Sequence, residues 1–338
     1  MSYPAALDFL YGLQQHGVRL GLAPIQALLA RLGAPQHRYR TFHIGGTNGK
    51  GSTAAMTASI LQAEGYRVGL YTSPHLVDFR ERIRVNGGPI TEEAVANLTE
   101  RLQREMEGVC LPTFFEFTTA MALQYFADCA VEAAVIEVGL GGRFDATNVV
   151  MPLASAITNV ALDHQAYLGD TLRAIAWEKA GIMKPQVPVV AGRLCPEAEA
   201  VIARVASEQD APVYRLGRDF TVTGESLTGF RYEGLRVTYQ DLSCSLAGAH
   251  QLENAACALA LLESVSDSGL RLAETAIRAG LRATLWEGRL EVVERHPMLV
   301  LDGAHNPAAA TVVAAYLADY RRQIRDPQAR VGPDRGAR

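Results

Sequence analysis

The sequence has few of the features that mark secreted, membrane-bound or nucleic-acid-binding proteins. None of its apolar runs reaches the ~18 residues that a membrane-spanning helix needs, and the first residues lack the basic and apolar regions of a signal peptide. The five cysteines lie far apart without a C-x-x-C pair, which argues against a zinc cluster and a disulfide framework. The formal net charge of −4 offers no overall attraction to nucleic acid or an anionic membrane. We therefore expect a cytoplasmic protein with no nucleic-acid and no membrane partner.

Length and pattern favour an α/β enzyme of two domains. The 338 residues are about twice the ~150 of an average domain, and 49% apolar with 20% charged residues is ordinary for a globular enzyme. Short apolar segments alternate with helical patterns, which predicts a doubly wound, mostly parallel sheet covered on both faces. The expected strands are residues 41–44, 67–71, 133–138, 154–158, 187–190 and 212–214.

The pattern changes twice in the second half of the chain. Alternating residues with turn signals at about 220–246 predict antiparallel hairpins added to the sheet edge. A new strand pair begins after residues 288–289, which predicts a first domain at 1–287 and a second α/β domain at 288–325. Residues 326–338 are rich in Arg, Gly and Pro and predict a disordered basic tail. Because free-standing domains usually have ~100–150 residues, we expect the second domain to be truncated.

A glycine-rich run between a predicted strand and a predicted helix indicates phosphate binding. Glycines let backbone N–H groups converge on phosphate oxygens, and the helix N-terminus adds its dipole. Lys50 would reach the β/γ-phosphates, and the Ser52 hydroxyl would bind Mg²⁺. The strict G-x-x-x-x-G-K-[ST] pattern is broken, because Ile44 replaces its first glycine and Gly51 separates Lys50 from Ser52. The alternative is a glycine-rich turn with a solvated lysine. The expected nucleotide-binding residues here are Asn48, Gly49, Lys50, Gly51 and Ser52.

The broken pattern T-x-G-K-G-[ST] resembles the amide ligases of the Mur family. The longer strings Leu32-Gly33-Ala34-Pro35-Gln36 and residues 43–52 narrow the match, and the chain resembles folylpolyglutamate synthase/dihydrofolate synthase from about residue 5 to about residue 317. The resemblance implies a P-loop central domain, ATP as a cofactor and two Mg²⁺ sites.

Four residues beyond the loop are candidates for the metal sites. Glu137 lies near the end of an apolar strand, where α/β sheets bind ligands, and is either a Mg²⁺ ligand or a salt-bridged glutamate. The resemblance implies that Ser73 helps to hold magnesium and that His164 binds a second ion. It also implies that Lys179 is carbamylated, which would turn it into an anionic ligand. Gln165 and Ala166 replace the family's usual Thr-Asp beside His164.

The resemblance also implies the remaining substrate contacts. Nucleotide contacts are implied for Asn254, otherwise explained as a helix cap, and for the C-terminal residues Arg289, Asp302 and His305. Aromatic rings can sandwich a pterin, and a carboxylate can accept from its N–H groups. The expected acceptor-binding residues are Phe115, Glu116, Phe117, Thr118, Asp145, Ala146 and Thr147.

These expectations define an ATP-dependent carboxylate–amine ligase acting as a monomer. Lys50, His164 and Lys179 would serve catalysis as the acceptor carboxylate attacks the γ-phosphate, and L-glutamate would then attack the acyl phosphate. The acceptor would be dihydropteroate, tetrahydrofolate or both. Three alternatives remain: a P-loop kinase, a Mur-type cell-wall ligase with a UDP-linked acceptor, and a nucleotide- or pterin-binding fragment whose shortened second domain leaves it impaired.

Overall fold

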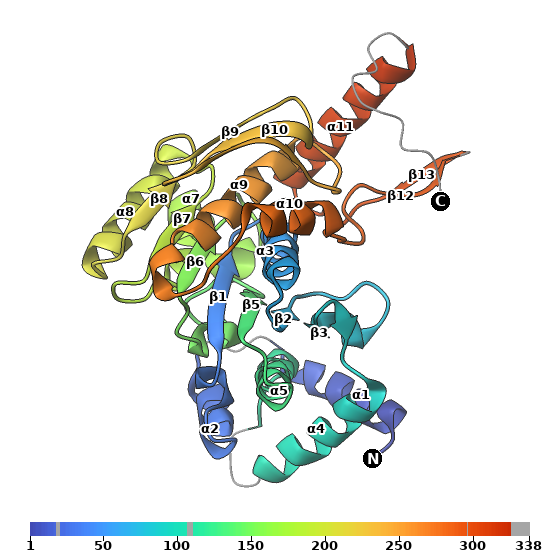
Figure 1. Cartoon of the computed structure of the whole chain (residues 1–338). Coiled ribbons are helices and arrows are strands. Elements are labelled where there is room, and N and C mark those ends of the chain that lie inside the picture. The colour runs from blue at the N-terminus through green and yellow to red at the C-terminus, as the bar shows by residue number, and fades with distance from the viewer. Residues whose placement is uncertain (18–20, 107–110, 296, 326–338) are drawn as a thin grey trace.

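The computed structural model describes residues 1–17, 21–106, 111–295 and 297–325, so the expected disordered tail at 326–338 lies outside the described residues. The centre of the molecule is an eight-stranded sheet in the order β4-β3-β2-β5-β1-β6-β7-β8 (Figure 1). Six neighbouring strands are parallel, and β3 and β4 are antiparallel additions at one edge. The strands are β1 (Arg40–Gly45), β2 (Val68–Tyr71), β3 (Ile83–Val85), β4 (Gly88–Pro89), β5 (Ala133–Glu137), β6 (Ala154–Ile157), β7 (Val189–Ala191) and β8 (Val213–Arg215).

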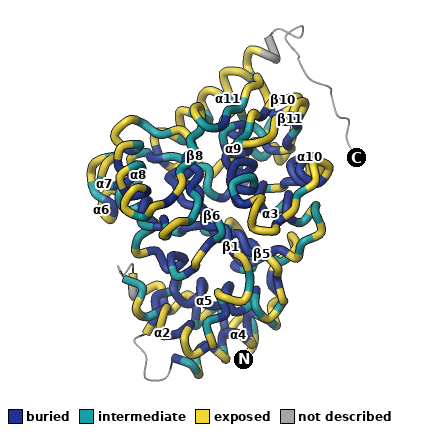
Figure 2. The backbone as a smooth tube through the Cα atoms, turned by 60° about the vertical axis from the view of Figure 1, so that its left-hand side comes forward, coloured by how far each residue is buried: buried dark blue, intermediate teal, exposed yellow. Residues whose placement is uncertain are grey.

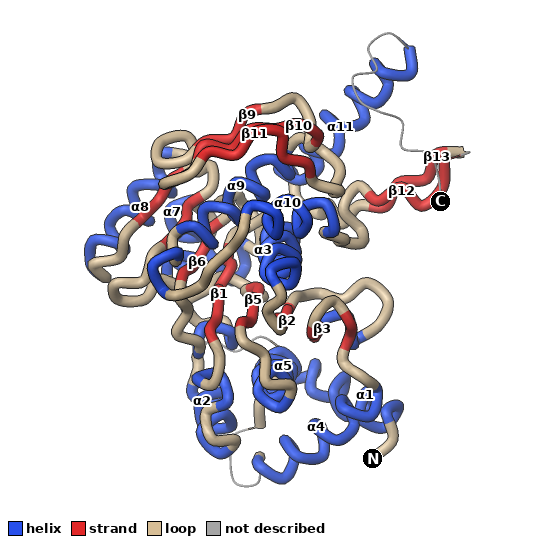
Figure 3. Tube along the Cα trace, in the orientation of Figure 1, coloured by secondary structure: helices blue, strands red, loops and turns tan. Residues whose placement is uncertain are grey.

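Helices cover both faces of this sheet, as the apolar strands require (Figure 3). Side chains alternate along β5, so that Ala133 and Val135 join one apolar cluster while Ala134 and Ile136 join another. The first cluster includes α3 (Lys50–Glu64), α9 (His250–Glu263) and α10 (Glu274–Ala283). The second includes α1 (Tyr3–Gly12), α2 (Ala23–Arg31), α4 (Glu92–Glu105) and α5 (Phe114–Asp128). A third cluster holds α7 (Leu172–Ala180) and α8 (Pro196–Glu208), and α6 (Gln165–Leu168) precedes them. These buried layers form the dark interior in Figure 2.

The antiparallel segment is a separate sheet, which corrects its expected place at the main sheet's edge. Strands β9 (Thr221–Thr223), β10 (Thr228–Glu233) and β11 (Thr238–Ser243) pair only with one another in the described part of the chain, apart from one isolated bridge between Leu216 and Phe220. Phe230, Tyr232 and Leu242 are fully buried in the cluster that includes α9. The sheet is therefore held by its one apolar face rather than by backbone pairing to the larger sheet.

The expected second strand pair forms a small sheet of its own. Strands β12 (Glu291–Arg295) and β13 (Met298–Leu301) form a hairpin, which α11 (Pro307–Arg325) follows. Both extend away from the main body (Figure 1). No helix among the described residues is long and apolar enough to cross a membrane.

Candidate functional site

A cavity of about 910 Å³ lies beyond the carboxyl ends of the parallel strands. Its walls come from the loop between β1 and α3, the ends of β2, β5 and β6, the start of α5, and the segment before α11. Open α/β sheets bind ligands at this edge, because the loops that follow neighbouring strands meet there. The cavity brings together most of the residues that the sequence predicted.

The glycine-rich loop is held open by the loop that follows β6. The Asn48 N–H donates to Asn159 Oδ1 (2.9 Å), and the Thr158 hydroxyl donates to the Asn48 carbonyl (2.6 Å). Gly49 has a φ of +82°, and a Cβ there would overlap the Asn254 amide. Helix α3 begins at Lys50, and no side chain caps it. Its first N–H groups are therefore available to an anion.

Helix α9 also supports the loop. Gln251 Nε2 donates to Ser52 Oγ (3.2 Å), and Asn254 Nδ2 donates to Gln251 Oε1 (2.8 Å). Asn254 is a buried residue inside α9 rather than its cap. Its side-chain amide lies against Gly49 of the loop. Lys50 Nζ donates to the Thr47 carbonyl at 3.0 Å, at the cavity wall.

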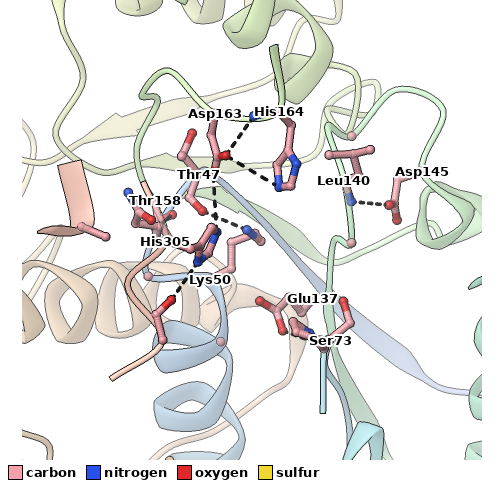
Figure 4. A pocket seen from close by; sticks show the side chains of 18 of the residues that line it. Thr47, Lys50, Ser73, Glu137, Leu140, Asp145, Thr158, Asp163, His164 and His305 are labelled. Carbon is pink, nitrogen blue, oxygen red and sulfur yellow. Dashed lines mark hydrogen bonds and ion pairs between the residues drawn. The ribbon is translucent and has the colours of Figure 1, made fainter. Parts of the chain in front are cut away.

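Glu137 is a buried carboxylate at the end of β5, only 5% exposed. Its Oε2 accepts from the Ser73 N–H at 3.0 Å (Figure 4). Burial raises its pKa, while Lys50, the Ser73 N–H and Arg289 act in the opposite direction. Ser52, Ser73 and Glu137 line the same cavity and supply the oxygen ligands that Mg²⁺ prefers. The residues present therefore fit a magnesium site.

A second potential metal site joins the loop after β6 to the C-terminal segment. One ligand atom each from Asp163, His164 and His305 lies within 4.8 Å of the others, and these side chains point toward one another in Figure 4. Partial burial raises the pKa of Asp163. The hydrogen bond from Asn306 and the charges of His164 and His305 lower it by more, so the net shift is downward. Asp163 was not predicted from the sequence, although it directly precedes His164 in the loop after β6.

Lys179 is buried on α7 next to the phosphate loop. Its Nζ donates to the Gly46 carbonyl at 2.8 Å, and it lines a small pocket with Lys50, Asp163 and His164. Burial, together with the charge of Lys50, lowers its pKa to about 7. The lowered pKa favours the neutral amine, which is the form that reacts with carbon dioxide.

The expected acceptor residues divide into two groups. Phe115, Glu116, Asp145 and Ala146 line the cavity. Asp145 is 6% exposed and accepts from the Leu140 N–H (2.8 Å), the Thr147 N–H (3.0 Å) and the Thr147 hydroxyl. Burial raises its pKa, and these hydrogen bonds oppose the shift.

The structure does not bring Phe117, Thr118 and Thr147 into the cavity. Phe117 is fully buried and packs edge-on against Phe9, with the ring centroids 5.4 Å apart. Thr118 is also fully buried, and its hydroxyl donates to the Phe115 carbonyl (3.2 Å). Successive residues of a helix point in different directions, so only part of the F-E-F-T string can face the ligand. Phe144, which begins the string that contains Asp145, lines the cavity, and so does Phe114, which was not predicted from the sequence.

The C-terminal segment contributes Arg289, Asp302 and His305 to the same cavity. Asp302 Oδ1 accepts from the Ala304 N–H at 2.8 Å and Oδ2 accepts from the Leu290 N–H at 2.9 Å, which orders the turn. Asn306, another unselected residue, ties the turn to the phosphate loop. Its Nδ2 donates to Asn48 Oδ1 and to Asp163 Oδ2, both at 2.9 Å.

Known proteins are similar to this chain in sequence and in fold. Residues 44–262 match the Mur ligase middle domain. The chain is 41% identical over 316 residues to a dihydrofolate synthase/folylpolyglutamate synthase of Bacillus subtilis, with 90% of this chain and 74% of the relative covered. A solved FPGS–AMPPCP–folate complex has a TM-score of 0.89 at 39% identity, covering 95% of this chain and 81% of that one. Escherichia coli FolC in complex with DHPP and ADP has a TM-score of 0.85 at 35% identity, covering 99% and 76%.

Proposed function

Because the chain belongs to the folylpolyglutamate synthase/dihydrofolate synthase family of Mur-type ligases, we propose that it joins L-glutamate to dihydropteroate, to tetrahydrofolate or to both, at the expense of ATP. One observation carries this assignment. A single cavity connects the phosphate loop, through Ser73 and Glu137, to the aromatic and carboxylate end at Phe115 and Asp145. A nucleotide and a flat pterin acid can therefore occupy it together. The relatives' names and bound ligands agree, since they include an ATP analogue, ADP, folate and DHPP.

The ATP phosphates would bind the uncapped N-terminus of α3. The N–H groups of this first turn and the ammonium of Lys50 offset the phosphate charge. Asn254 would contact the nucleotide from α9, and Arg289, Asp302 and His305 from the C-terminal segment. Phosphoryl transfer depends mainly on positioning and charge stabilisation. The N–H groups of α3 and the ammonium of Lys50 would stabilise the charge, and the other residues would position the nucleotide.

Ser52, Ser73 and Glu137 would hold one magnesium ion, and His164 with a modified Lys179 would hold a second. Magnesium, when bound, neutralises phosphate charge. The lowered pKa of Lys179 supports carbamylation, because the neutral amine is the form that reacts. Asp163 lies beside both His164 and His305 and would orient them through its carboxylate.

The acceptor would bind with its pterin ring beside Phe115 and Phe144. Asp145 can accept from the ring N–H groups, while Ala146 leaves room for the ring. The acceptor carboxylate would then attack the γ-phosphate, forming an acyl phosphate and ADP. The amine of L-glutamate would attack the acyl carbon and release phosphate, leaving an amide. Enclosure by the C-terminal segment limits hydrolysis of the acyl phosphate.

We further assign residues 1–287 to the ATP- and pterin-binding domain and 288–325 to part of the C-terminal Mur ligase-type domain. The chain spans 74% of the Bacillus relative's length. We propose a monomer that acts in the cytoplasm.

Product analysis tests the proposal. The full chain is incubated with dihydropteroate, ATP, Mg²⁺ and L-glutamate, and the product is identified by mass spectrometry. A glutamyl amide that requires both ATP and glutamate is the expected result, and further units would add polyglutamate synthesis. A stable phosphorylated product would indicate a kinase, and turnover only with a UDP-linked acceptor would indicate a cell-wall ligase. ATP and pterin binding without any product would indicate an impaired fragment.

A further inference from the structure

Three arginines alternate along the segment that leads into β3, and the middle one differs from its neighbours. Arg80 pairs with Asp78 at 2.6 Å, and Arg84 pairs with Glu287 at 3.4 Å. Arg82 forms no ion pair with any described residue, although it is only 8% exposed. Burying a charge without a partner costs free energy, because the charge loses its hydration. A guanidinium cannot avoid this cost by losing its proton, because its pKa is too high. The unpaired Arg82 cation therefore calls for an anion from outside the chain.

The neighbours of Arg82 fix its side chain through Nε and the plane of the guanidinium, and they leave both Nη atoms without a hydrogen-bond partner among the described residues. Its Nε donates to His75 Nδ1 at 2.7 Å, and its guanidinium lies 5.3 Å from the Phe114 ring centroid. No hydrogen bond joins either Nη atom to the residues that the structure describes. Because His75 Nδ1 accepts, the imidazole is uncharged there, and burial together with Arg82 lowers its pKa. His75 is thus a neutral support and does not balance the charge.

Arg82 lines the large cavity together with Ser73 and Glu137 of the proposed magnesium site and with the aromatic residues Phe114 and Phe115. Glu137 interacts with Arg82 electrostatically but without an ion-pair contact. In the proposed function this carboxylate is committed to magnesium, so it is not available to pair with Arg82.

We infer that Arg82 binds a carboxylate of the pterin acceptor through its two Nη groups. This assignment rests on the proposed function and adds a residue that neither the sequence motifs nor the resemblance selected. A planar guanidinium matches a carboxylate with two parallel hydrogen bonds, and the Phe114 ring fixes its plane. The carboxylate is either the benzoate group of dihydropteroate or the additional α-carboxylate of a glutamyl acceptor. Both share the same chemistry.

A binding cycle tests the assignment without requiring turnover. Dissociation constants of the full chain are measured for pteroic acid, its carboxamide, folic acid and the α-carboxamide of folic acid, for the wild type and for Arg82→Gln. Arg80→Gln is the matched control, because Arg80 lies two residues away and is paired outside the cavity. Thermal unfolding of each variant verifies that it is folded, and Arg82→Lys retains charge without the planar fork.

The wild type is expected to prefer an acid over its amide by about tenfold to a hundredfold, the range of a charge-assisted hydrogen-bonded pair. Arg82→Gln abolishes this preference and Arg82→Lys restores part of it, whereas Arg80→Gln leaves it intact. If Arg82→Gln loses the preference for pteroic acid over its carboxamide, Arg82 binds the benzoate carboxylate. If it loses only the preference for folic acid over its α-carboxamide, Arg82 binds the α-carboxylate. Equal binding of acid and amide by the wild type, or an unchanged preference in Arg82→Gln, would overturn the assignment. Absence of pterin binding would instead refute the acceptor class and this assignment with it.

Discussion

Acidification should destabilise the chain through His43, which lies on β1 behind the acceptor end of the cavity. His43 is fully buried, and its Nε2 lies 2.8 Å from Thr147 Oγ1. The Thr147 hydroxyl donates to Asp145, so its oxygen accepts from Nε2–H of the imidazole. The neutral state of the ring follows from its burial. Burial, with a contribution from Lys184, lowers the pKa of His43 to about 3.

The size of the effect follows from proton linkage. The folded-state pKa of about 3 lies below the ordinary value of 6.5, so the unfolded chain binds more protons between these values. The stabilisation is therefore complete above pH 6.5 and is lost as the pH falls toward 3. Between pH 7.5 and pH 5 this single group should remove about 2 kcal/mol from the free energy of unfolding.

Urea unfolding at pH 7.5 and pH 5 measures this loss for the wild type and for His43→Gln. Glutamine retains a donor toward Thr147 but does not titrate, so the difference between the two proteins isolates His43 from the other acid-sensitive groups. We expect the wild type to lose about 2 kcal/mol more than His43→Gln. Equal losses in the two proteins would refute the neutral buried imidazole.

Three further substitutions probe the site. Gly49→Ala places a Cβ against the Asn254 amide in a backbone conformation with φ +82°, and should weaken ADP binding at least about tenfold by calorimetry while leaving pteroic acid affinity unchanged. Asn306→Ala removes the bonds to Asn48 and Asp163 and should raise the KM for ATP by roughly tenfold; an unchanged KM would contradict the tie between turn and loop. Glu137→Gln should lower kcat about a hundredfold and should not lower the melting temperature in metal-free buffer, because it removes a buried charge; a marked loss of stability would contradict the metal-binding role.

The sequence predicted the parallel sheet well because its strands are short, apolar and bounded by helices with clear ends. All six predicted strands appear, shifted by one or two residues. Strands β3 and β4 were missed, since neither has a continuous apolar pattern and both pair only at an edge. The place of the 220–246 segment could not be predicted, because alternation identifies an apolar face but not the surface that covers it.

The candidate site was predictable where function depends on local motifs. The phosphate loop follows β1 and Glu137 ends β5, and the sheet topology brings such strand ends together. Asn306 and Arg82 matter through contacts with distant residues, such as Asn48 or the Phe114 ring, and no spacing rule reveals those. Phe117 shows the converse limit, because a motif does not indicate which side of a helix faces the cavity.

Oxygen transfer from the acceptor tests the proposed acyl phosphate most directly. Dihydropteroate labelled with ¹⁸O in its carboxylate is incubated with the full chain, ATP, Mg²⁺ and L-glutamate, and the released phosphate is analysed by mass spectrometry. If the carboxylate attacks the γ-phosphate, each glutamyl amide formed is accompanied by one phosphate that carries one ¹⁸O atom. Phosphate without label, or ATP cleavage without amide formation, would contradict the proposed ligase chemistry.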